Sequence, residues 1–152
     1  MMRKVLLTTV FLSLLPFAVV AQSLQESLAS APDIPFAEWR DMTAGQTVVY
    51  EIDGNTFAYE AYRRGTNRID IRLDSGGCVS GTWYMDEPAF CFDWEDGPLN
   101  CFRHKRLDGL IYVIGVENGE ETADIQKVSR IAPIPVQCGP ALLSLFIPEA
   151  FP

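Results

Sequence analysis

The stretch AFCFDWEDGPLNCFR, residues 89–103, predicts a β-hairpin and with it the class of the fold. A three-residue loop, Glu95-Asp96-Gly97, with Gly97 in the left-handed conformation would join two antiparallel strands. This loop puts Cys91 opposite Cys101 at a non-hydrogen-bonded pair, where side chains approach most closely. We therefore expect a Cys91–Cys101 disulfide on one face. The aromatic residues of the hairpin should lie on the other face, toward the core: Phe90, Phe92, Trp94 and Phe102.

The N-terminus has the pattern of a cleaved export signal. Arg3 and Lys4 precede a mostly apolar run over residues 5–20, and small residues end at Ala21. A membrane anchor is the alternative, but this run is short for a hydrocarbon core of ~30 Å. We expect residues 1–21 to be a signal peptide, with no membrane span after its cleavage. The protein should then be periplasmic or secreted.

The cysteines agree with an exported chain. All four lie after the signal, and an even number of cysteines in an oxidising compartment predicts disulfides. Three connectivities are possible. The hairpin selects Cys91–Cys101, which leaves Cys78–Cys138. No C-x-x-C pair is present, so the spacing disfavours a zinc site or a redox-active pair.

Short β-type runs separated by turn residues follow one another from residue 47 to 130. The expected strands are residues 47–52, 56–63, 68–73, 78–85, 89–94, 99–103, 110–116 and 122–128. Asp53-Gly54-Asn55 and Asn118-Gly119 are hairpin turn signals. Eight consecutive strands with short connections predict an all-β, antiparallel up-and-down meander. We expect a small closed or nearly closed barrel, because closure removes exposed edges.

Alternation along the strands predicts which side chains share a face. The expected sets are Val48, Tyr50 and Ile52; Phe57, Tyr59 and Ala61; Ile69, Ile71 and Leu73; and Val79, Gly81, Trp83 and Met85. If the turn at Asn118-Gly119 is type I′, Ala123 and Ile125 lie opposite Ile114 and Tyr112.

The barrel, residues 47–130, is flanked by two segments of different character. Residues 22–46 contain one helical pattern, Ile34 to Met42, which could plug one barrel end. Residues 131–152 contain five prolines and cannot form regular sheet or a long helix. We expect this tail to be a strap, tied down by Cys138, that covers the outer face of residues 110–116.

A G-x-W…C-x-x-W…C pattern runs through the middle of the chain. It comprises Gly81-Thr82-Trp83, Cys91-Phe92-Asp93-Trp94 and Asn100-Cys101-Phe102. On this pattern, residues 36–130 resemble small exported proteobacterial proteins of unknown function with short, lipocalin-like β-barrels. The resemblance implies a periplasmic location and brings no catalytic residues with it.

Residues that could carry out chemistry are few. His104 is the one histidine, which excludes a His-rich metal site, and we expect neither a metal nor a cofactor. A catalytic triad would need Ser75, Ser80 or Ser129 beside His104, and no G-x-S-x-G elbow is present. Because His104 lies in the basic run 103–106, we expect it to be a solvated residue at a strand end.

Acidic residues gather around the hairpin: Asp86, Glu87, Asp93, Glu95 and Asp96. They could form a calcium site or the carboxylate pair of a glycosidase, but their spacing fits no calcium loop. We expect them to solvate the hairpin. An exported hydrolase that uses a carboxylate pair near the Asp86–Asp96 hairpin is the alternative hypothesis for function.

The favoured hypothesis is a non-enzymatic binding or interaction module without catalytic residues. The interior of an eight-stranded barrel is either filled by side chains, the commoner case, or open for one small ligand. The partner would be a small apolar ligand or an envelope protein. A net charge of −8 argues against nucleic acid. The candidate ligand-binding residues are aromatic: Tyr50, Tyr59, Trp83, Phe92, Trp94 and Phe102.

Overall fold

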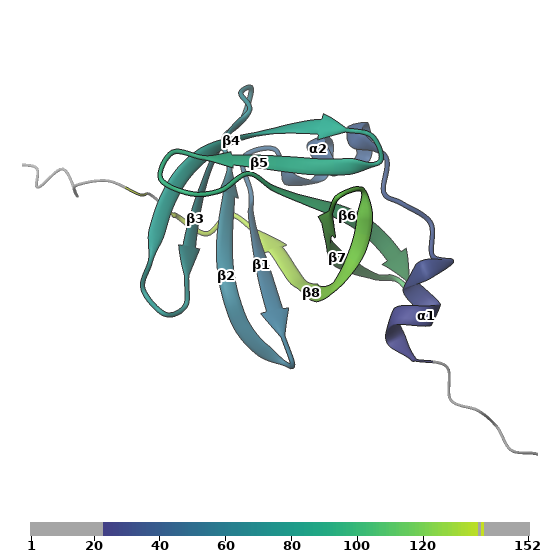
Figure 1. Cartoon of the computed structure of the whole chain (residues 1–152). Coiled ribbons are helices and arrows are strands. Elements are labelled where there is room, and N and C mark those ends of the chain that lie inside the picture. The colour runs from purple at the N-terminus through teal and green to yellow at the C-terminus, as the bar shows by residue number, and fades with distance from the viewer. Residues whose placement is uncertain (1–22, 137, 139–152) are drawn as a thin grey trace, which may run out of the picture.

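The eight strands form a closed antiparallel barrel in simple meander order, as predicted (Figure 1). A computed structural model describes residues 23–136 and Cys138. Each strand pairs with the next in sequence, and β8 returns to β1. The elements are α1 (Leu24–Ala29), α2 (Phe36–Thr43), β1 (Thr47–Ile52), β2 (Asn55–Tyr62), β3 (Arg68–Leu73), β4 (Cys78–Asp86), β5 (Ala89–Trp94), β6 (Asn100–Leu107), β7 (Leu110–Glu117) and β8 (Glu120–Ala132).

Three two-residue turns fix the hairpins. Asp53-Gly54, Asp108-Gly109 and Asn118-Gly119 have positive φ at both positions, as type I′ turns require. The first and third are the predicted turns. The second was not predicted, and it extends β6 to Leu107, four residues beyond the expected end of this strand.

The β5–β6 hairpin has the predicted register, with Cys91 opposite Cys101. Both expected disulfides are present, Cys91–Cys101 and Cys78–Cys138. The predicted turn conformation is wrong, because Gly97 does not have a positive φ. β5 instead follows β4 to its end, where Trp94 pairs with Gly81, so the β5–β6 ladder stops at Phe92 and Asn100.

A β-bulge reverses the predicted face of β2. Tyr50 pairs with Ala58 but Glu51 pairs with Thr56, which leaves Phe57 as an extra residue. From Ala58 onward the even-numbered residues point inward, so Tyr62 lies in the core and Tyr59 outside. For β3 and β4, the predicted faces are confirmed by the membership of the core cluster.

The β7–β8 register also differs from the prediction. Val116 pairs with Glu121 as a type I′ turn requires, but Ile114 then pairs with Ile125 instead of Ala123. A bulge over residues 122–124 adds two residues to β8, which shifts the register without changing the face. Gly115 lies opposite this bulge, where a Cβ would come within 2.7 Å of the Thr122 hydroxyl oxygen.

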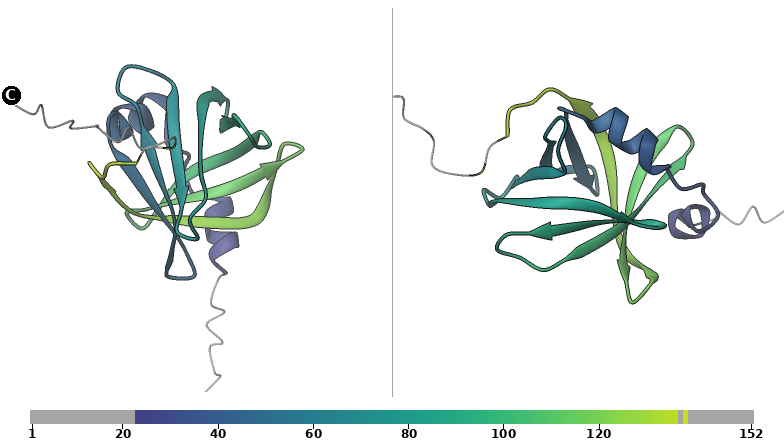
Figure 2. Two further views of the ribbon diagram at one scale, coloured as in Figure 1. Left: turned by 90° about the vertical axis from the view of Figure 1, so that its left-hand side faces the viewer. Right: turned by 90° about the horizontal axis from the view of Figure 1, so that it is seen from above.

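The α2 helix closes one half of the barrel, as expected. Its Trp39 is fully buried, and Phe36 packs on Trp83 and Phe90. In two views α2 lies against the barrel, and α1 lies on the outer side of the barrel beside β6 (Figure 2). No helix among residues 23–136 is long and apolar enough to cross a membrane.

The α1 helix is a second helix that we did not predict. Ser23 and Glu26 form a capping box at its start, a signal that is legible in the sequence. On the outer side of β6, the Lys105 ammonium donates to the Leu28 carbonyl at 2.9 Å and contacts Glu121 at 2.5 Å. These contacts tie α1 to the barrel.

The described part of the C-terminal strap, residues 133–136 and Cys138, lies over a different face than predicted. The Thr47 hydroxyl donates to the Ile134 carbonyl, Arg63 donates to the Val136 carbonyl, and Cys138 reaches β4 at Cys78. The described part of the strap thus passes over β1 to β4, because β8 ends beside β1. The predicted face on β7 is not covered by it, and Leu110 is exposed. Residues 139–152, including the apolar run 142–147 expected to dock, lie outside the described part of the chain.

Candidate ligand-binding cavity

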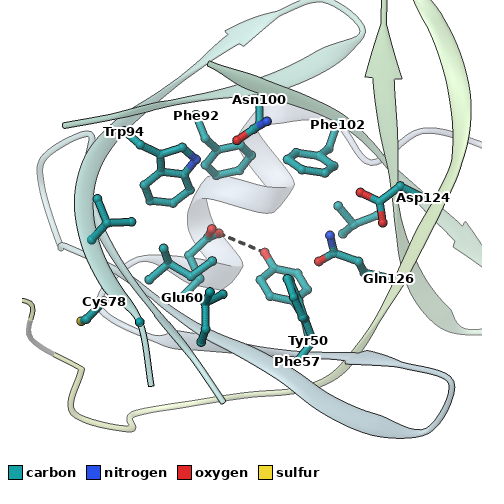
Figure 3. Close-up of a pocket in the computed structure, with 15 residues that line it drawn as sticks. Tyr50, Phe57, Glu60, Cys78, Phe92, Trp94, Asn100, Phe102, Asp124 and Gln126 are labelled. Carbon is teal, nitrogen blue, oxygen red and sulfur yellow. Dashed lines mark hydrogen bonds between the residues drawn. The ribbon is translucent and has the colours of Figure 1, made fainter. Parts of the chain in front are cut away.

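The half of the barrel away from α2 contains a cavity of about 460 Å³ (Figure 3). All eight strands contribute to its lining. The residues are Tyr50, Phe57, Glu60, Ile71, Leu73, Gly77, Cys78, Val79, Phe92, Trp94, Asn100, Phe102, Val113, Asp124 and Gln126. A volume of this size is typical of pockets that hold small ligands, roughly 300–1,000 Å³.

The other half of the barrel is filled by aromatic side chains around α2. Trp39 packs on Phe90 and Tyr62, and Tyr62 in turn packs edge-on against Trp83. The Trp39 indole also donates to the Tyr62 hydroxyl at 3.2 Å. This layer separates the cavity from the α2 end, so the interior is half filled and half open.

Aromatic rings from β5 and β6 form one wall of the cavity. Phe92 and Trp94 are stacked with centroids 5.9 Å apart, and Phe102 meets Phe92 edge-on at the same distance. Gly81 permits this arrangement, because a Cβ there would lie 2.9 Å from the Trp94 ring and 2.5 Å from the Asp93 carbonyl oxygen. The three rings present a continuous apolar surface, with Tyr50 and Phe57 across from it (Figure 3).

A buried carboxylate forms the floor of the cavity. Glu60 is 4% exposed and accepts hydrogen bonds from Tyr50 at 3.0 Å and from Tyr62 at 2.5 Å, both at Oε1. Tyr50 lines the cavity, whereas Tyr62 belongs to the filled half. Glu60 therefore lies at the boundary between the filled and the open halves of the interior.

Burial raises the pKa of Glu60 to about 7, although the two tyrosine hydroxyls oppose this shift by stabilising the charged form. The same burial, together with the Glu60 charge, raises the pKa of Tyr50 and of Tyr62 well above the usual value. Both hydroxyls consequently stay protonated and remain donors. Glu60 changes its charge close to neutral pH.

Polar side chains complete the lining. Gln126 and Asp124 extend from β8 and Asn100 from β6 (Figure 3). None of the fifteen lining residues is Lys, Arg or His. The cavity therefore combines aromatic walls with two carboxylates and two amides, and it has no positive charge of its own.

The predicted ligand-binding residues are only partly brought together. Tyr50, Phe92, Trp94 and Phe102 line the cavity. Trp83 lies in the filled half against Phe36, and Tyr59 lies outside the barrel, where the Arg72 guanidinium is 4.8 Å from its ring. The β2 bulge is the physical reason for the placement of Tyr59.

The polar residues of the cavity were not predicted. Glu60 occupies a position that the β2 alternation placed outside, and the bulge turns it inward. The segment Phe57–Tyr62 has aromatic residues at both odd and even positions, so alternation alone does not decide which face of this strand points inward. Asp124 and Gln126 alternate with Val128 of the core, a pattern that identifies the inward face of β8.

His104 is not the solvated residue that we expected. Its side chain is fully buried, with its ring centroid 4.4 Å from Trp39 and 4.5 Å from Phe90. Neither ring nitrogen has a hydrogen-bond partner in the described part of the chain, and burial lowers the pKa to about 3. The reason is that β6 continues past Arg103, so that His104 points inward under α2.

Neither Ser80 nor Ser129 hydrogen-bonds to this histidine. The Ser80 hydroxyl donates to Asp70 at 2.6 Å and the Ser129 hydroxyl to the Val49 carbonyl at 3.3 Å. The described residues thus contain no arrangement of Ser80 or Ser129 with His104 that would activate a hydroxyl.

The acidic residues of the hairpin do not converge. Asp86 ends β4 and Glu87 follows it, whereas Glu95 and Asp96 follow β5. The two groups therefore lie at opposite ends of the β4–β5 pair. All of them are exposed, and Glu95 forms a surface ion pair with Arg68 at 2.9 Å. Residues 23–136 and Cys138 contain no group of three or more side chains positioned to hold a metal ion.

Comparison of the chain with protein-family models, with curated proteins and with solved structures gives no match. The resemblance to small exported proteobacterial proteins stays a prediction.

Proposed function

We propose that this protein is an exported, non-enzymatic binding module of the periplasm whose barrel holds one small, largely apolar ligand. The observation that carries the proposal is the cavity of about 460 Å³ between the aromatic wall and Glu60. Barrels of eight strands have room for one small ligand when side chains leave the interior open. The lipocalin-like resemblance agrees with this use of a closed meander barrel.

Export is supported by the signal pattern of residues 1–21 and by the two disulfides, which are typical of oxidising compartments. N-terminal sequencing of the protein from the periplasm should begin at Gln22. An intact Met1 on membrane-bound protein would contradict the proposal.

Native mass spectrometry of the protein purified from its own periplasm tests the binding function. We expect a small molecule to be retained at one copy per chain and to be released on unfolding. A Leu73→Trp variant, which places a large ring in the cavity, should lose the retained mass while keeping its disulfides. If the protein instead retains a protein partner and no small molecule, the binding site is an outer surface and the proposed use of the cavity is contradicted.

A further inference from the structure

We propose that the ligand of this cavity is a small organic cation, a primary ammonium on an aromatic or apolar body. The ammonium lies against the Glu60 carboxylate, and the body lies between Trp94, Phe92 and Phe102. This inference rests on the proposed function, since it requires that the cavity binds a ligand.

The charges of the lining select the sign of the ligand. Glu60 and Asp124 supply two carboxylates, Asn100 and Gln126 supply amides, and no lining residue is basic. A ligand carboxylate would therefore lose its hydration without gaining a positive partner, and it would be repelled by two like charges. An ammonium group would meet opposite charge in the same volume.

Glu60 has hydrogen-bonding capacity to spare. Both tyrosine hydroxyls donate to Oε1, and no donor to Oε2 is found among the described residues. A primary ammonium has three N–H donors, and its hydrogen bond to a carboxylate is about twice as strong as one between neutral groups. Glu60 lines the cavity, so a bound ligand can reach it.

The energetics of the buried carboxylate point the same way. Burial penalises the charged form of Glu60 and raises its pKa to about 7. A nearby positive charge compensates a buried carboxylate and lowers its pKa again. Binding of an ammonium ion would thus remove an existing cost, whereas binding of a neutral molecule would leave it in place.

The aromatic wall suits the rest of such a ligand. Ring faces attract cations electrostatically, and the rings bury the apolar body of the ligand by packing. The Phe92 and Trp94 rings are nearly parallel, with an angle of 11° between their planes, and both line the cavity together with Glu60. The cavity volume accommodates one aromatic ring with a short chain.

The test measures the binding of three probes of similar size to the intact, oxidised protein: phenylbutylamine, phenylbutanol and phenylbutyrate. Isothermal titration calorimetry at about pH 8 keeps Glu60 largely ionised and the amine protonated. We expect the amine to bind about tenfold more tightly than the alcohol, and the acid more weakly than both, since a charge-assisted hydrogen bond is gained by the amine alone.

A matched pair of variants locates the preference. Glu60→Gln keeps the size of the side chain and an acceptor for the two tyrosines, and it should lower amine affinity about tenfold while leaving alcohol affinity within about threefold. Glu117→Gln removes an exposed carboxylate at the end of β7 and should change neither affinity. Loss of alcohol binding in Glu60→Gln would mean that the substitution has changed the cavity itself. The order of affinities of the three probes for the wild-type protein then tests the cation assignment alone.

Equal binding of amine and acid, or tighter binding of the acid, would overturn the cation assignment and leave the binding module standing. Failure of all three probes to bind would contradict the proposed function together with this inference.

Discussion

Two buried titratable groups, Glu60 and His104, should oppose each other in the pH dependence of stability. The pKa of Glu60 is raised from 4.5 to about 7, so between these values the folded chain keeps a proton that the unfolded chain has released. The pKa of His104 is lowered from 6.5 to about 3, so the unfolded chain binds a proton there that the folded chain does not. Rising pH therefore destabilises the fold through Glu60 and stabilises it through His104.

Both effects are present between pH 4.5 and 6.5, where the two windows overlap. Each group changes the free energy of unfolding by about 1.4 kcal/mol per pH unit, or about 3 kcal/mol over this range. In the wild type these contributions nearly cancel. In Glu60→Gln only the His104 contribution remains, so stability should rise by about 3 kcal/mol from pH 4.5 to 6.5. In His104→Leu it should fall by about the same amount.

Urea unfolding of the oxidised protein, followed by tryptophan fluorescence at several pH values, measures these slopes. His104→Leu exchanges a buried imidazole for an apolar side chain of similar volume, and Glu60→Gln keeps the hydrogen bonds to the tyrosines. Glu117→Gln, which removes an exposed carboxylate, is the control for loss of one negative charge. Slopes of the same sign in the two variants, or slopes equal to that of the wild type, would refute the reasoning.

Three further predictions follow from packing, crosslinks and the cavity. Trp39→Ala should lower the free energy of unfolding by about 3–5 kcal/mol, but Trp94→Ala by only about 2 kcal/mol, because Trp94 is half-buried beside the cavity. Equal losses in urea unfolding would contradict an interior that is filled at Trp39 and open at Trp94. Replacing Cys78 and Cys138 by serine should lower the free energy of unfolding by about 4 kcal/mol, because this bridge closes the longer loop. Replacing Cys91 and Cys101 should lower it by about 3 kcal/mol, and the reverse order in urea unfolding would contradict the chain-entropy argument. The affinity for phenylbutylamine should fall as the pH drops below about 7, because Glu60 then takes up a proton and loses its charge. The titratable groups around Glu60 are Tyr50, Tyr62 and Asp124. An affinity that is constant from pH 8 to 5 would exclude Glu60 as the partner of the ammonium.

The meander, the closure and the disulfides could be predicted because each depends on local signals. Two-residue turns such as Asn118-Gly119 fix the connection, and alternation fixes the face of regular strands such as β3 and β4. The Cys91–Cys101 pairing came out correctly although Gly97 does not adopt the expected conformation. The ladder ends at Phe92 and Asn100, so the longer connection that forms keeps the same register as the predicted three-residue loop.

The candidate site could not be predicted as well, because it depends on irregularities in the sheet. The bulge at Phe57 turns Glu60 inward and Tyr59 outward. Aromatic residues at both odd and even positions of this segment leave its face ambiguous and do not locate the bulge. His104 was misplaced for a related reason. The turn Asp108-Gly109 lengthens β6, so His104 lies inside the strand and not at its end. The burial of His104 then depends on the docking of α2 against β6, a tertiary contact that the sequence pattern does not show.

Glu60 and His104 are both costly to bury, but only Glu60 borders a cavity where a ligand could offset the cost. This difference makes Glu60→Leu informative. At pH 8 the variant removes an ionised carboxylate from a buried site, and apolar replacement of such a group is often neutral or stabilising even though Tyr50 and Tyr62 lose an acceptor. We therefore expect a free energy of unfolding at pH 8 equal to or above that of the wild type, together with loss of amine binding, as in other sites where function is kept at the expense of stability. Destabilisation by more than about 3 kcal/mol, the cost of breaking a buried polar network, would instead identify Glu60 as a structural member of the core whose hydrogen bonds hold β1 and β2 together.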